Sequence, residues 1–160
     1  MRRLILALVV LAGSSAHADL ADDVRCREVG FSVSAETRDA ELFASFIDFD
    51  ARFVGNSVSR GPSSITEAWS VFLTNGGPAI KWRPQFVELL EDESLALTRG
   101  PYRMITTDEN GVETEHWGTF NSIWRLNDDG VWRVVFDAGN AAAEAPADEV
   151  KALLDQEDNC

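Results

Sequence analysis

The sequence is poor in the residue types that build common catalytic, metal-binding and nucleic-acid-binding motifs. It has only 2 cysteines, 2 histidines and 1 tyrosine, and its 14 basic residues stand against 27 acidic ones, for a net charge of −13. Such an acidic chain repels phosphate backbones and anionic lipid headgroups, so we expect neither a nucleic-acid nor a membrane partner. The cysteines and histidines show no metal-ligand spacing, and we expect no metal ion.

Two chemical motifs are also missing. There is no G-x-S-x-G nucleophile elbow, and the run Gly76-Gly77-Pro78 ends a helical pattern where a phosphate-binding loop would open one. We therefore expect no cofactor, and any catalysis would depend on carboxylates.

The chain begins with a pattern typical of export. Arg2 and Arg3 precede an apolar run over 4–12, and small residues follow it up to Ala16-His17-Ala18. The run is shorter than the roughly 20 residues that span a membrane. It predicts a signal peptide over 1–18, cleaved after Ala18, and a periplasmic or secreted product.

The cysteines agree with that compartment. Cys26 and Cys160 lie near the two ends of the mature chain, and an oxidising environment favours a disulfide between them. A pair of free thiols is the alternative. A bridge over such a long loop would contribute about 4–5 kcal/mol in the loop-entropy model.

Apolar spacing predicts helices first and strands second. Helical spacing marks 20–36 and the segment after the candidate N-cap Asp39, a short strand follows over 49–54, and a capping box at Ser64 opens a third helix. Alternation then predicts strands over 80–90, 95–106, 115–126 and 131–137, separated by turn-forming segments. This order indicates one α+β domain over 19–139, followed by an acidic tail over 140–160 with a short helix.

The last two strands define a core face by their period of two. The even positions of the first are Phe120, Ser122, Trp124 and Leu126, and Trp132, Val134 and Phe136 share a face in the second. We predict that these side chains pack beneath the helices. For Trp124 and Trp132, core packing is therefore favoured over a direct role in chemistry. Ser122 needs a polar partner or a ligand on such a face, and parity places Asp137 on the opposite face.

Four segments carry a resemblance to a known family. They are DAELFASFIDFDARFVG (39–55), RGPSSITEAWSVF (60–72), KWRPQFVELLEDESLALTRGPY (81–102) and GTFNSIWRLNDDGVWRVVFDAG (118–139). With these segments the chain resembles the nuclear transport factor 2-like superfamily, which includes ketosteroid isomerase-like and SnoaL-like proteins. It is most similar to the branch called domain of unknown function 4440. The resemblance implies a cystatin-like α+β roll, in which a cone-shaped, strongly curved antiparallel sheet wraps around the N-terminal helices.

The resemblance also implies a cavity at the wide end of the cone. Its expected lining is Trp69, Phe72, Trp82, Tyr102, Trp117, Ser122 and Trp124. An apolar space with few polar groups suits a small hydrophobic ligand. The alternative is that side chains fill the cone.

Candidate catalytic residues are Tyr102, Asp48, Asp137 and His116. Relatives use a carboxylate base with a tyrosine that stabilises an oxyanion, but that pattern does not carry over residue by residue. The favoured role of Tyr102 is that of an amphipathic strand residue with its hydroxyl at the surface, and the favoured place of Asp48 and Asp50 is a helix-to-strand turn. For Asp137 a salt bridge or loop hydrogen bond is the favoured role.

His116 and one further side chain, Arg99, each have both a chemical and an ordinary interpretation. His116 has a pKa suited to acid–base work, yet it sits near a strand start where an exposed histidine is common. Arg99 would bind an anionic ligand if it faced inward, and otherwise would pair with a carboxylate.

Three functions remain open from the sequence. The first is a ligand-binding or accessory domain, the second an isomerase-like or cyclase-like enzyme, and the third a homodimeric interaction module. For the third, Ile123, Val131 and Val135 would make the outer sheet face apolar, while Arg125 and Arg133 oppose a dry interface.

Overall fold

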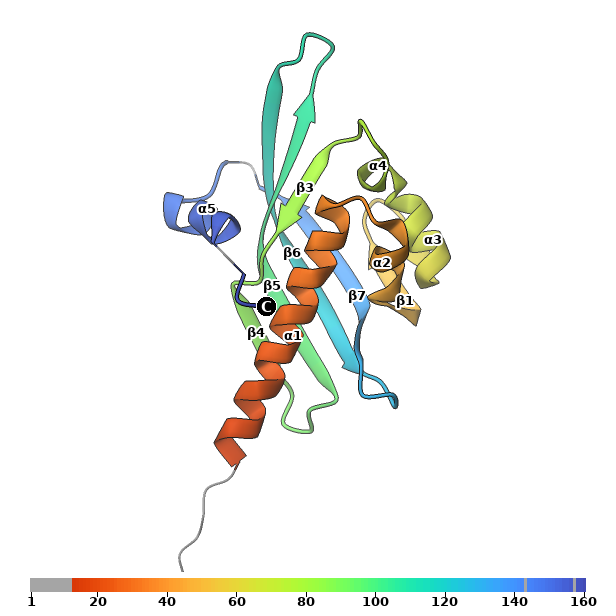
Figure 1. Ribbon diagram of the computed structural model, residues 1–160, viewed down its shortest axis with the longest axis vertical. Helices are drawn as coiled ribbons and strands as arrows, with labels where there is room; N and C mark the ends of the chain where they lie inside the picture. The colour runs from red at the N-terminus through yellow and green to blue at the C-terminus, as the bar shows by residue number, and fades with distance from the viewer. Residues whose placement is uncertain (1–12, 143, 157) are drawn as a thin grey trace, which may run out of the picture.

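The computed structural model describes residues 13–142, 144–156 and 158–160 (Figure 1). The helices are α1 (Gly13–Glu36), α2 (Ala40–Ser45), α3 (Gly61–Ala68), α4 (Ser70–Leu73) and α5 (Asp148–Asp155), and the strands are β1 (Ile47–Val54), β2 (Val58–Arg60), β3 (Ala79–Trp82), β4 (Phe86–Leu89), β5 (Leu95–Thr107), β6 (Glu113–Leu126) and β7 (Trp132–Ala141). None of the helices described there is long and apolar enough to cross a membrane. The first part of the predicted signal peptide, 1–12, lies outside the described residues, and cleavage after Ala18 stays a prediction.

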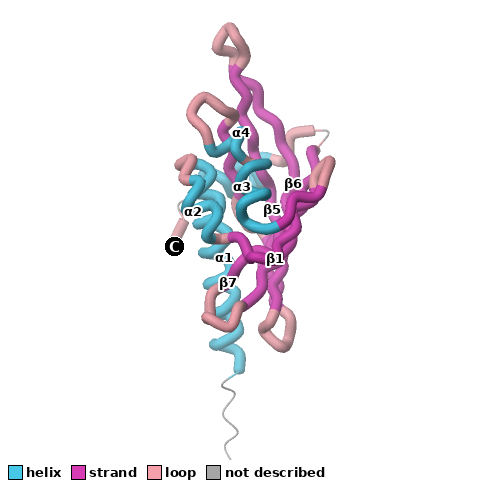
Figure 2. Tube along the Cα trace, turned by 90° about the vertical axis from the view of Figure 1, so that its right-hand side faces the viewer, coloured by secondary structure: helices cyan, strands magenta, loops and turns pink. Residues whose placement is uncertain are grey.

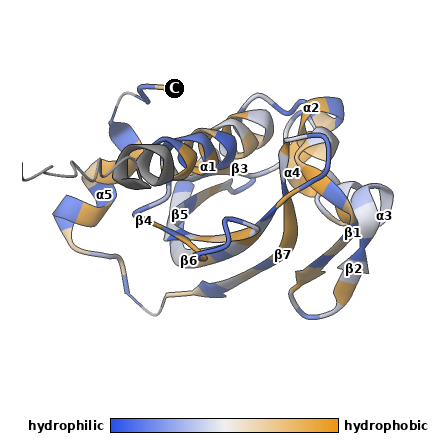
Figure 3. Ribbon diagram, turned by 90° about the horizontal axis from the view of Figure 1, so that it is seen from below, coloured by the Kyte–Doolittle hydropathy of each residue, from blue (hydrophilic) through white to orange (hydrophobic). Residues whose placement is uncertain are grey.

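The strands form one sheet in the order β2-β1-β7-β6-β5-β3, and β4 also pairs with β5. All pairs are antiparallel except β1 with β7, which is parallel. Figure 3 shows the sheet curving beneath α1, with α2, α3 and α4 gathered at one end, and Figure 2 shows α1 and α2 to one side of the strands. The predicted α+β class, with a curved sheet wrapped around N-terminal helices, is confirmed. The parallel pair, which alternation cannot show, makes the sheet mixed.

The core is an aromatic cluster between α1 and the inner face of the sheet. Phe31 on α1 stands at its centre and its ring lies 4.6 Å from Phe43, 5.3 Å from Trp82 and 6.1 Å from Trp124, measured between centroids. Gly30 keeps the neighbouring turn of α1 open, because a Cβ there would lie 2.9 Å from the Phe46 ring. The glycine that weakens the helical pattern in the sequence thus lets α2 dock closely.

One β-bulge changes which residues of β7 face the core. Pairing runs Trp124 with Val134 and then Ile123 with Phe136, so β7 carries one extra residue, Val135. Beyond the bulge every side chain is on the opposite face from the one that strict alternation predicts. Trp124, Trp132, Val134 and Phe120 are buried as predicted. The predicted core position of Phe136 is wrong, since its side chain is 51% exposed. The prediction that Asp137 faces away from the core is also wrong, since it pairs with buried Ser122.

Local backbone chemistry explains two other differences in element bounds. The predicted strand over 80–90 is broken into β3 and β4 at Arg83-Pro84, because proline has no N–H for the ladder. The third helix begins at Gly61 instead of at Ser64, with Pro62 in its first turn and no side-chain cap. Proline favours that position because its missing N–H would have no helical partner.

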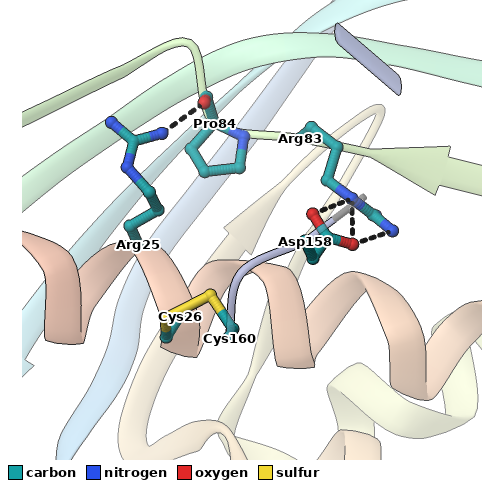
Figure 4. The surroundings of a disulfide bond; sticks show 6 residues. All are labelled: Arg25, Cys26, Arg83, Pro84, Asp158 and Cys160. Atoms are coloured by element: carbon teal, nitrogen blue, oxygen red, sulfur yellow. Dashed lines mark hydrogen bonds and ion pairs between the residues drawn. A yellow bond between two sulfur atoms is a disulfide. The ribbon is translucent and has the colours of Figure 1, made fainter. Parts of the chain in front are cut away.

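The C-terminal segment returns to α1 along the edge of the sheet and is tied there (Figure 4). Leu154 of α5 is fully buried, and Cys160 forms the predicted disulfide with Cys26, with their Cα atoms 5.4 Å apart. Next to it, Arg83 makes ion pairs of 2.8 Å with Asp158 and 2.7 Å with Glu36. The buried guanidinium therefore joins the tail to α1 through two carboxylates.

Candidate functional site: the cavity in the cone

A cavity of about 340 Å³ opens between the inner face of the sheet, α3, α4 and the β1–β2 turn. Its walls are mainly aromatic, supplied by Phe31, Phe53, Trp69, Phe72, Trp82 and Phe120. The rings of Trp69 and Trp82 lie 5.8 Å apart and those of Trp69 and Phe72 5.3 Å apart, so they form one continuous wall. Such a volume with such walls suits a small apolar molecule.

Asp137 is the one carboxylate among the described residues that line the cavity. The Ser122 hydroxyl donates a hydrogen bond of 2.8 Å to Asp137 Oδ2. The pKa of Asp137 is raised to about 7, mainly by burial; the Ser122 hydrogen bond opposes this shift and the negative charge of Glu28 adds to it. At neutral pH this side chain can therefore both accept and release a proton.

Glu28 lies behind Asp137 and is fully buried in the middle of α1. Its Oε1 accepts a hydrogen bond of 2.6 Å from Trp82 Nε1, and its Oε2 accepts one of 2.7 Å from Trp124 Nε1 and one of 2.5 Å from Thr98 Oγ1. Burial raises the pKa of Glu28, while the hydrogen bonds from Thr98, Trp82 and Trp124 lower it. Glu28 is linked to Asp137 through its charge, which raises the pKa of Asp137.

The sequence interpretation missed Glu28, although its position in the sequence indicates a buried carboxylate. Glu28 lies four residues after Val24 and three before Phe31, which places a charged group within the buried stripe of a helix. A carboxylate on such a stripe needs donors from the facing sheet, and the two indole N–H groups are those donors.

Tyr102 lies in the cavity wall on β5, between Trp82 and Gly118 on the neighbouring strands. Its ring covers Gly118 so closely that a Cβ there would lie 2.3 Å from the ring carbon Cζ. Burial raises the pKa of the Tyr102 hydroxyl, which keeps it a hydrogen-bond donor at neutral pH.

The predicted lining is only partly the observed one. Trp69, Phe72, Trp82 and Tyr102 line the cavity, whereas Ser122 and Trp124 are fully buried behind its wall. Trp117 lies on the outer face of the sheet instead, in a separate pocket beside the C-terminal segment. Neighbouring residues of a strand point to opposite faces, so Gly118 faces the cone and Trp117 cannot.

The other candidate residues lie outside the cavity lining. Asp48 is fully buried and accepts hydrogen bonds from the Asp50 N–H at 2.8 Å and from Asn127 Nδ2 at 3.0 Å, which fits the helix-to-strand turn. His116 is exposed and lies 2.9 Å from Thr106 Oγ1. Arg99 is exposed and donates to Asn121 Oδ1 at 2.6 Å, so its partner is an amide. Among the described residues no group of His, Cys, Asp and Glu is placed to hold a metal ion.

Comparison with known proteins identifies the fold. The sequence matches no family model and no curated protein. Among solved structures, an NTF2-like protein with a cystatin-like fold from Novosphingobium aromaticivorans has a TM-score of 0.68 at 18% identity, covering 92% of this chain and 99% of its own. An NTF2-like superfamily protein from Salmonella enterica serovar Typhimurium has a TM-score of 0.68 at 15% identity, with coverage of 83% and 98%. A ketosteroid isomerase-like protein from Erwinia carotovora atroseptica has a TM-score of 0.64 at 17% identity, with coverage of 79% and 98%. The chain thus has the nuclear transport factor 2-like fold.

Proposed function

We propose that this domain binds a small, mostly apolar molecule in the cone and orients it through Asp137. The observation that carries the proposal is a cavity of about 340 Å³ with aromatic walls, which Asp137 alone among the described carboxylates lines. We also propose that the chain belongs to the branch called domain of unknown function 4440, because of its sequence resemblance to that branch. We further propose a periplasmic or secreted location, which the disulfide between Cys26 and Cys160 supports.

Binding can be tested with a panel of small aromatic and alicyclic compounds, read by thermal shift and tryptophan fluorescence. A ligand at 100 times its Kd should stabilise the protein by about 2.7 kcal/mol. Met104→Trp, which fills the cavity, should abolish the shift, whereas Val112→Trp in the exposed β5–β6 turn should preserve it. Silence across the panel at millimolar concentration would exclude the proposal.

Proton transfer is a second candidate, favoured by Asp137 and Tyr102 lining the same cavity. A carboxylate with a pKa of about 7 is matched to general acid–base work at neutral pH. A neutral tyrosine could donate a hydrogen bond to a developing oxyanion. This arrangement suits the migration of a proton next to a carbonyl group.

The raised pKa of Asp137 predicts a specific pH dependence of stability. The unfolded side chain ionises near pH 4 and the folded one near pH 7, so the contribution of Asp137 to stability falls as pH rises through this window. Asp137→Asn should therefore be more stable than the wild type at pH 8, and this gain should disappear at pH 4. Urea unfolding at the two pH values measures it, and carbon-13 NMR of the Asp137 carboxyl measures the pKa directly. A carboxyl that titrates near pH 4 would remove the acid–base candidate.

One observation supports the homodimer alternative and another opposes it. The bulge turns Phe136 outward beside Ile123 and Leu97, which gives the outer face an apolar row. Val135, expected on that face, is only 2% exposed. A monomeric mass at high protein concentration would exclude this alternative.

A further inference from the structure

The charges of the cavity wall point to a ligand class. We propose that the cone binds an organic cation, a small molecule in which an ammonium or N-methylated group is joined to an apolar or aromatic body. This inference rests on the proposed binding function and adds the sign of the ligand's charge.

The first argument is the charge balance of the cavity. Asp137 lines it, and no lysine, arginine or histidine lines it among the described residues. Within that part of the chain, Asp137 has only the Ser122 hydroxyl as a hydrogen-bond partner. Two other buried ionic groups have oppositely charged partners in the chain, since Arg83 pairs with Glu36 and Asp48 with Arg125. Buried Glu28 has no such partner, but it accepts hydrogen bonds from three side chains, whereas Asp137 accepts one. A charge in an apolar site is costly without a partner, so a cation is the complementary ligand and an anion is excluded.

The second argument is the orientation of the indole in the wall. Trp82 directs Nε1, the positive edge of its ring system, at Glu28 at 2.6 Å. Trp82 also lines the cavity, with its ring next to that of Trp69, which in turn packs against Phe72. Aromatic faces attract cations, and tryptophan does so most strongly. Aromatic rings around one carboxylate form the kind of site that recognises alkylated ammonium groups.

The third argument is the set of titratable groups facing Asp137. Glu28 of α1 interacts with it electrostatically from behind, and Tyr102 of β5 lies in the same wall. The residues that line the cavity from α3, α4 and the β1–β2 turn carry no titratable group. The potential in the cone is therefore negative whenever either carboxyl group is ionised, and Tyr102 does not offset it.

Three probes of similar size separate the possibilities in titrations of the full chain at pH 8. Phenyltrimethylammonium carries the positive charge, tert-butylbenzene has the same shape without it, and benzenesulfonate is the anion. We expect the cation to bind at least about tenfold more tightly than its neutral isostere. Benzenesulfonate should not bind.

The role of Asp137 is tested with a matched pair of substitutions. Asp137→Asn should remove the preference for the cation, while Asp128→Asn in the exposed β6–β7 turn should retain it. Lowering the pH from 8 to 6 should weaken cation binding to the wild type about tenfold, because only about a tenth of Asp137 stays ionised at pH 6. This pH series needs no variant, so a folding defect in Asp137→Asn would not affect it.

The outcomes distinguish this inference from the proposed function. Equal or tighter binding of tert-butylbenzene, or binding of benzenesulfonate, would overturn the cation inference and leave small-molecule binding intact. If none of the probes binds but a neutral compound of the panel does, the inference again fails alone. If nothing binds at all, both fail.

Discussion

Replacement of Glu28 by alanine should lower the free energy of unfolding by about 3–5 kcal/mol. The substitution would leave Trp82 Nε1 without an acceptor. Trp124 Nε1 and the Thr98 hydroxyl would lose their shorter hydrogen bonds and keep only the longer ones, to Thr98 Oγ1 at 3.1 Å and to the Ser122 carbonyl at 3.4 Å. Indole N–H groups can only donate, and each buried donor without a partner costs about 1–3 kcal/mol. Urea unfolding at pH 7, followed by tryptophan fluorescence, would measure the loss.

Two further variants sharpen this prediction. Glu28→Gln keeps one carbonyl acceptor but turns an amide toward the other donors, so we expect an intermediate loss. Asp23→Ala, at an exposed position of the same helix, should change stability by less than about 0.5 kcal/mol. A loss below about 1 kcal/mol in Glu28→Ala would show that the three donors find other partners.

Glu28 also has an effect at the cavity that a purely structural residue would lack. Its charge raises the pKa of Asp137. Glu28→Gln should therefore lower the pKa of Asp137, and carbon-13 NMR of the Asp137 carboxyl would detect this shift in a folded variant. An unchanged pKa would mean that Glu28 supports the wall without tuning the carboxylate in it.

Alternation assigned the inward face of β6 correctly and that of β7 only as far as Val134. Along β6 the period of two held, because the strand is regular from Phe120 to Trp124, and its inward residues were assigned correctly. Along β7 it failed after Val134, because a bulge depends on pairing with a partner strand and leaves no mark in the period of a single strand. The same bulge brings Asp137 into the cone, so the residue central to the site was the hardest to place.

Helical spacing had a different limit. The pattern over 20–36 found the stripe that faces the sheet, and α1 ends at Glu36 as expected. The spacing of apolar residues does not predict which polar residues on that stripe are buried. A buried carboxylate is stable only with donors from distant segments, here from β3, β5 and β6, and those contacts arise from the tertiary fold.

Reduction of the disulfide between Cys26 and Cys160 should cost about 4–5 kcal/mol of stability, because the bridge closes a loop with a sequence separation of 134. In the loop-entropy model the unfolded chain regains its freedom, and contacts that hold the tail only in the folded state cannot replace this constraint. The Arg83–Asp158 ion pair and buried Leu154 should keep the tail docked in the reduced native protein. The cavity does not include either cysteine, so ligand affinity should be unchanged.

A substitution cycle separates the covalent constraint from the loss of individual side chains. Cys26→Ser, Cys160→Ser and the double variant should all lose the same stability, since breaking one end of the bridge removes its whole effect. Guanidinium unfolding with and without reductant provides the comparison, and the three variants should show no response to reductant. Additive losses in the double variant would mean that the two cysteine side chains contribute separately, and equal stability of the oxidised and reduced wild type would mean that the bridge itself contributes nothing to stability.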